Sequence, residues 1–137
     1  MYDAPKIWEE MPADVRAAID ILLDDGFRIA EAASGGMASG LIRLSGDIEA
    51  IVSRDRGQWM FDFHLAGKNL DLDAVIAART QRSDWTPAAA DKRRPTQVPD
   101  VEWRVEVAAG LNWLRSNPDA VAQVEEAKRQ RSKILWS

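Results

Sequence analysis

The chain has 137 residues, one histidine and no cysteine; 46% of its residues are hydrophobic and 29% are charged. This length and composition predict one globular domain over residues 1–137, and the lack of cysteine excludes disulfides, thiolate metal sites and a cysteine nucleophile. The net charge of -4 argues against a sequence-independent nucleic-acid binder, because neutralising phosphates requires an excess of lysine and arginine.

The N-terminal region contains a predicted helix over residues 12–25. Apolar side chains recur at helical spacing from Val15 to Leu23, Pro12 suits the first turn, and Gly26 provides a stop. The ten residues at the start of the chain lack the basic and apolar segments of a secretion signal, and no later apolar run approaches the ~18 residues of a membrane span. We therefore expect a cytoplasmic protein without membrane contact.

Between residues 27 and 65 the apolar period changes to two, which predicts strands over 27–32, 38–44, 48–54 and 58–65. Glycine-containing turns separate them, so the strands form a four-stranded antiparallel meander. In the last strand Trp59, Phe61 and Phe63 alternate with more polar neighbours, which places these three aromatic residues on one buried face.

Three helices are predicted after the strands, over residues 69–82, 101–115 and 118–133, with Asn69 or Asp71 capping the first of them. The connection over residues 83–99 carries three prolines and is predicted to be a mobile or partner-contacting loop. The predicted class is α+β, with an N-terminal helix, the four-stranded meander and three C-terminal helices packed on one sheet face.

No residue pattern in the chain indicates catalysis, a cofactor or a metal site. Asp62 and His64 share a strand face and could act as a base with its orienting partner, but no nucleophile with a supporting motif lies near them in the sequence. The glycine-rich segment 34–40 leads into a strand, whereas phosphate loops lead into a helix. We therefore expect a protein that is not an enzyme, and an enzymatic alternative centres on Asp62 and His64.

Charge is distributed unevenly along the chain. Residues 1–77 hold 14 acidic and 7 basic side chains, a net of -7, and residues 78–137 hold 8 acidic and 11 basic ones, a net of +3. This asymmetry predicts an acidic face opposite a mildly basic C-terminal region, and an acidic face favours a cationic partner.

The hairpin over residues 51–63 contains the segment Asp55-Arg56-Gly57-Gln58-Trp59. It resembles the strand-turn-strand segment of small immunity proteins from bacterial polymorphic toxin and contact-dependent growth inhibition systems, and the resemblance extends over residues 48–85. Such a family implies an α+β fold, no catalysis, no cofactor and a cognate toxin domain as partner. The resemblance assigns no binding residues.

The resemblance and the charge pattern predict an immunity protein that covers the active site of a toxin, often a nuclease, with an acidic surface. The partner is expected to be a cationic toxin C-terminal domain, and the protein is expected to be a monomer that binds no nucleic acid. The alternative is an acidic secretion chaperone or another small protein-binding adaptor, and a chaperone would dimerise and expose apolar grooves. The predicted partner-binding residues are Asp62, Asp71, Asp73, Asp84 and Trp85.

Overall fold

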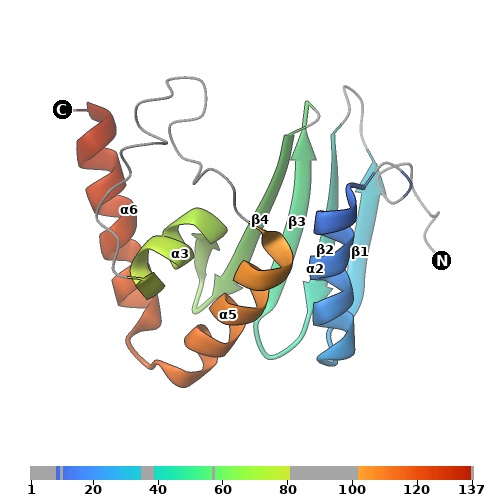
Figure 1. Ribbon diagram of the computed structural model, residues 1–137, viewed down its shortest axis with the longest axis horizontal. Coiled ribbons are helices and arrows are strands. Elements are labelled where there is room, and N and C mark those ends of the chain that lie inside the picture. Colours follow the sequence, from blue (N-terminus) through green and yellow to red (C-terminus); the bar gives the residue numbers. More distant parts are fainter. Residues whose placement is uncertain (1–8, 10, 35–38, 57, 81–101, 137) are drawn as a thin grey trace.

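The computed structural model describes residues 9, 11–34, 39–56, 58–80 and 102–136 and has an α+β architecture (Figure 1). The N-terminal helix α2 is followed by five strands and then by three helices. Their bounds are α2 Ala13–Asp24, β1 Arg28–Ser34, β2 Gly40–Ser45, β3 Glu49–Asp55, β4 Gln58–Leu65, β5 Lys68–Asp71, α3 Leu72–Thr80, α5 Trp103–Ser116 and α6 Ala120–Trp136.

The strands form one antiparallel sheet in the order β1-β2-β3-β4-β5, so every neighbour in the sheet is a neighbour in the chain. The meander is confirmed, but the predicted number of four strands is wrong. Residues 68–71 form a fifth strand paired with β4, although the predicted helix began at residue 69. The chain can reverse in two residues there because Ala66 and Gly67 both adopt positive φ angles, 54° and 74°, as in the tight turns that match sheet twist.

Helix α2 ends where the sequence predicts, at Gly26. This glycine has a φ of 104°, and its N–H donates to the Leu23 carbonyl at 3.1 Å, while the Phe27 N–H donates to the Leu22 carbonyl at 3.0 Å. These two bonds form a Schellman motif, which satisfies carbonyls that a helix end would otherwise leave without a donor. The motif turns the chain directly into β1 and buries Phe27.

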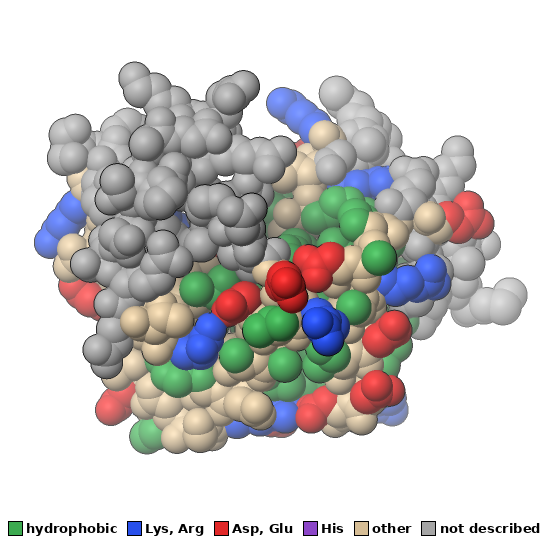
Figure 2. All heavy atoms as spheres, in the orientation of Figure 1, with side chains coloured by type: hydrophobic (Ala, Val, Ile, Leu, Met, Phe, Trp, Pro, Cys, Tyr) green, Lys and Arg blue, Asp and Glu red, His purple; other side chains and the backbone are tan. Residues whose placement is uncertain are grey.

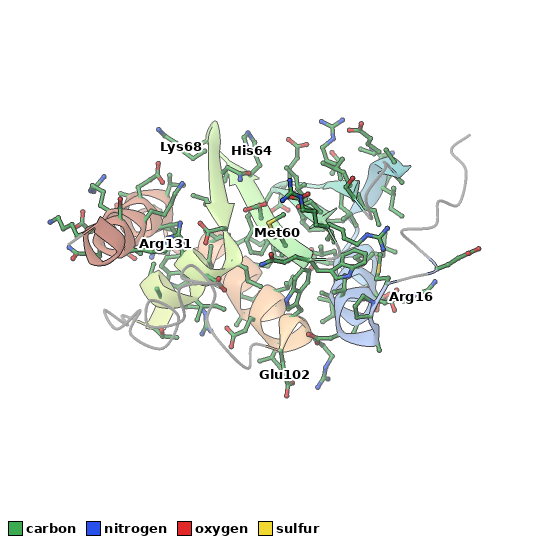
Figure 3. The ribbon with its side chains drawn as sticks, turned by 90° about the horizontal axis from the view of Figure 1, so that it is seen from above. Arg16, Met60, His64, Lys68, Glu102 and Arg131 are labelled. Atoms are coloured by element: carbon green, nitrogen blue, oxygen red, sulfur yellow. The ribbon has the colours of Figure 1, made fainter. Side chains whose placement is uncertain are left out.

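One face of the sheet and the helices that pack on it enclose the core (Figures 1 and 3). Phe61 and Phe63 are buried on this face, with ring centroids 4.9 Å apart in an edge-to-face arrangement, and Trp103 of α5 meets Phe61 at 5.7 Å. Trp59 lies on the same face, as predicted, but it is half-buried and packs under the guanidinium of Arg54, 5.3 Å from its ring centroid.

Helices α2 and α5 lie side by side, with the same direction, and polar contacts join them at both ends. The Asp14 carboxylate on α2 accepts hydrogen bonds from the Trp103 and Arg104 N–H groups in the first turn of α5, at 3.0 and 3.5 Å. At the other end Arg115 of α5 binds Asp25 at 2.6 Å and Asp47 at 2.7 Å. Asp14 thus caps a helix that starts 89 residues later in the chain.

Candidate protein-binding face

The second face of the sheet is covered by none of the described helices. Figure 1 shows the helix layer in front of the sheet, and Figure 3, seen from above, shows His64 of β4 on the opposite side from α2 and α5. Because side chains alternate along a strand, the residues between the buried ones point to this second face. We call its central part the open face, formed by Leu41, Arg43, Ile51, Met60 and Asp62.

The strand register places Ile51 at the centre of the open face. Ile51 on β3 lies directly between Arg43 on β2 and Asp62 on β4. Leu41 and Met60 both pair with Ser53, two residues further along β3, so each is a diagonal neighbour of Ile51 and within reach of its side chain. Met60, at the margin of this cluster, is 40% exposed.

Arg43 already has acidic neighbours within the chain. Its guanidinium lies 3.6 Å from Glu31 on β1 and 3.6 Å from Glu49 on β3, and all three side chains are well exposed. Exposed pairs of this length contribute little to stability, because water screens them and the long side chains lose freedom. Arg43 therefore remains able to exchange these contacts for a better-placed carboxylate.

Asp62 and Asp71 face each other directly across β4 and β5. Pairs alternate outward from the two-residue turn, so these carboxylates occupy the closely spaced, non-hydrogen-bonded kind of pair, with Cα atoms about 4.5 Å apart. Within the described part of the chain Asp71 forms an ion pair: Arg131 of α6 binds both of its oxygens, at 2.7 and 3.1 Å. Among the described residues Asp62 has no ion pair within 4 Å.

The pKa of Asp62 reflects this difference. Burial raises the pKa of Asp62 to about 6, and the negative charge of Asp71 adds to the shift, while Lys128, a hydrogen bond with Asn69, and Arg131 oppose it. Desolvation penalises the charged form of a carboxyl group, and a second carboxylate penalises it further. Asp62 is thus the least satisfied charge on the open face.

Helix α6 covers the edge of the sheet beside this carboxylate pair. Lys128 donates to the Asn69 carbonyl on β5 at 3.0 Å and pairs with Glu125 at 3.1 Å, and Lys68 of β5 approaches the same glutamate at 3.7 Å. A lysine on an edge carbonyl prevents another strand from adding there, so the β5 edge is closed to strand addition.

The predicted partner-binding residues have different environments. Asp62 lies on the open face, and its role stays a prediction. Asp71 caps α3, accepting from the Ala74 N–H at 3.1 Å, and holds Arg131, so both of its oxygens serve the fold. Asp73 lies in the first turn of α3. Asp84, Trp85 and the predicted loop over 83–99 lie outside the described residues.

Sequence reasoning missed the apolar and basic members of the open face, Leu41, Arg43, Ile51 and Met60. The alternation in β4 assigned Met60 to the wetter side, but Leu41 and Ile51 are apolar and look like core residues in the sequence. Only the register shows that Ile42 and Val52, rather than Leu41 and Ile51, point toward the helices.

The enzymatic alternative depends on which side chains surround Asp62 and His64. His64 faces Glu49 on β3 and Asn69 on β5, and Asp62 is its neighbour along the strand. In the described part of the chain no group of three or more metal-binding side chains comes together. No described helix is long and apolar enough to cross a bilayer.

Comparison with family models, with curated proteins and with solved structures finds no match to this chain.

Proposed function

We propose that the protein is an immunity protein that binds a bacterial toxin domain, such as a nuclease, through the open face and blocks the active site of that toxin. The observation that carries the proposal is a sheet face that no described helix covers, where an exposed Met60 lies beside a carboxylate, Asp62, that has no ion pair among the described residues. A partly apolar surface with a few charges is typical of a protein interface. The hairpin resemblance supplies the class of partner.

The structure changes which acidic residues this proposal uses. Several carboxylates from the acidic first half are bound by arginines of the second half: Asp25 and Asp47 by Arg115, and Asp71 by Arg131. On the helix-covered side, Figure 2 shows acidic and basic side chains interspersed rather than gathered by sign. The proposal therefore rests on Asp62 and its apolar neighbours rather than on a broad acidic surface.

The secretion-chaperone alternative requires an exposed apolar groove. The large hydrophobic side chains that stand out as exposed in the described residues are Met60 and Val105, which lie on opposite layers of the molecule, on β4 and α5. Two separated side chains do not form a groove for an unfolded segment, so the described surface favours recognition of a folded partner.

The test is protection of cells. If a neighbouring open reading frame encodes a large secreted protein, the C-terminal domain of that protein would be co-expressed with this chain, and growth would be measured. We expect wild type and Asp20→Arg, a control on the outer side of α2, to restore growth, and Met60→Glu to fail although it folds. Growth arrest with wild-type protein present, or the absence of any such neighbouring gene, would count against the immunity function.

A further inference from the structure

The open face has a symmetry that the proposed function does not explain. Along its central row Arg43, Ile51 and Asp62 occupy successive strands β2, β3 and β4. In the next row Leu41, Ser53 and Met60 occupy the same three strands. In both rows the residues on β2 and β4 have complementary character: arginine opposes aspartate, and leucine opposes methionine.

We propose that the open face binds the open face of a second copy of this chain, forming a symmetric dimer. The two-fold axis lies between the two sheets and is parallel to β3. This rotation exchanges β2 with β4 while leaving β3 facing itself. Arg43 of one copy then meets Asp62 of the other, twice, and Ile51 packs on its own counterpart. Leu41 likewise meets Met60 in both halves.

The arrangement agrees with general rules for sheet packing and for symmetric dimers. Face-to-face sheets keep their strands within about 30° of each other, which a two-fold axis along a strand provides. A two-fold interface must be self-complementary, with residue i on j and j on i. The apolar centre has the exposed Met60 at its margin, and the charged pairs flank it, as in interfaces with an apolar core and a polar rim.

The dimer would relieve the electrostatic problem at Asp62. Within one chain this carboxylate faces Asp71, whose arginine is already used on both oxygens. Arg43 is held only by exposed contacts of 3.6 Å, so it can reorient toward a carboxylate from the other copy. At the margins Glu31 would face Asp71, which keeps its own Arg131. Glu31 gives up its contact with Arg43 in the dimer, so this like-charged pair opposes association and limits its strength.

The size of the face sets the strength of association. Five strands about 4.8 Å apart and about six residues long give roughly 500 Å² for each copy. This area is at the low end for specific protein pairs, so we expect a dissociation constant between about 10 μM and 1 mM. A toxin that binds the same face more tightly would displace the second copy by mass action, which makes dimerisation and partner binding mutually exclusive.

Sedimentation equilibrium of the purified full chain at about 1 to 500 μM tests the proposal. We expect the average mass to rise with concentration from 15.3 kDa toward twice that value. Arg43→Glu alone and Asp62→Arg alone should each stay monomeric, because each places like charges opposite one another. Asp20→Arg, an exposed change on the helix side, should dimerise as wild type does.

A mixture of the Arg43→Glu and Asp62→Arg variants is the most discriminating experiment. In that mixture each new glutamate faces a new arginine, and the unchanged Asp62 and Arg43 face each other, so a heterodimer should form. A wild-type mass that stays at 15.3 kDa throughout, or a dimer that persists in both single variants, would overturn the proposal. Failure of the mixture to dimerise would overturn the two-fold pairing. No toxin is present, so none of these results depends on the immunity function.

Discussion

Replacing Asp62 by asparagine should stabilise the protein at neutral and basic pH. The folded pKa of Asp62 is about 6, above the ordinary aspartate value of 3.8, so the native state binds this proton more tightly than the unfolded state does. Stability from a raised carboxyl pKa is present at low pH and is lost as the pH rises through the folded pKa. Asparagine keeps the shape and the neutral state, and therefore avoids that loss.

The magnitude follows from the difference between the folded pKa of about 6 and the ordinary pKa of 3.8. Each unit corresponds to about 1.4 kcal/mol, which gives an upper bound of about 3 kcal/mol. The carboxyl group is partly exposed and water screens it, so we expect a gain of about 1 to 2 kcal/mol at pH 8. The groups that face Asp62 include Asp71 and His64 on the sheet and Lys128 and Arg131 on α6, and all of them are unchanged in the variant.

Urea unfolding at about 2 μM protein, where a dimer of the expected strength is dissociated, would measure the effect. The free energies of unfolding of wild type and Asp62→Asn should differ at pH 8 and converge near pH 4. Asp20→Asn removes the same charge from an exposed position on α2 and should stay within ~0.5 kcal/mol of wild type. A variant less stable than wild type at pH 8, or a difference that persists undiminished at pH 4, would refute the assignment of an unfavourable charge to Asp62.

Two further predictions concern carboxylates that the fold uses. Asp71→Ala should lower the free energy of unfolding by about 2 to 4 kcal/mol, because it removes the cap of α3 and the bidentate partner of Arg131. This effect is opposite in sign to that of Asp62→Asn. An unchanged midpoint in urea unfolding would contradict the prediction. Arg115→Ala should destabilise the protein at pH 7. Hydrogen bonds from Arg115 lower the pKa of Asp25 and of Asp47. The stabilisation that these bonds provide is therefore lost as the pH falls below about 4. Thermal unfolding at several pH values should show the difference in stability between wild type and variant narrowing in that range.

Much of the fold could be predicted from local patterns. The period of two in residues 27–65 and the helical spacing elsewhere identify four of the five strands and all the described helices, because each element carries enough apolar residues to show its period. Strand β5 was missed because it has only four residues and one buried side chain, Leu70. A single apolar residue before a capping aspartate is also expected at a helix start, so the pattern did not distinguish β5 from a helix. The turn before β5 was hard to predict because Ala66, a non-glycine residue, adopts a positive φ in it.

The candidate site was less accessible to sequence reasoning, because a sheet face is assembled from residues that are far apart in the chain. Alternation within β4 places Asp62 and Met60 together, but it cannot show that Arg43 lies two strands away in the same row. The environment of Asp71 depends on Arg131, 60 residues later, which lies beside it because α6 packs against α3. Local patterns carry no information about such a pair.

The uneven charge along the chain acquires a different meaning once the contacts are known. Its prediction of an acidic face assumed that the acidic first half and the basic second half remain apart. In the fold Arg115 and Arg131 cross between the halves and bind Asp25, Asp47 and Asp71 at helix and strand ends. Asp62 has no ion pair of this kind among the described residues, and it lies on the face that no described helix covers. An ionised carboxylate that folding leaves in this state costs stability, so a partner cation, whether Arg43 of a second copy or a basic residue of a toxin, gains more there than at an acid already paired.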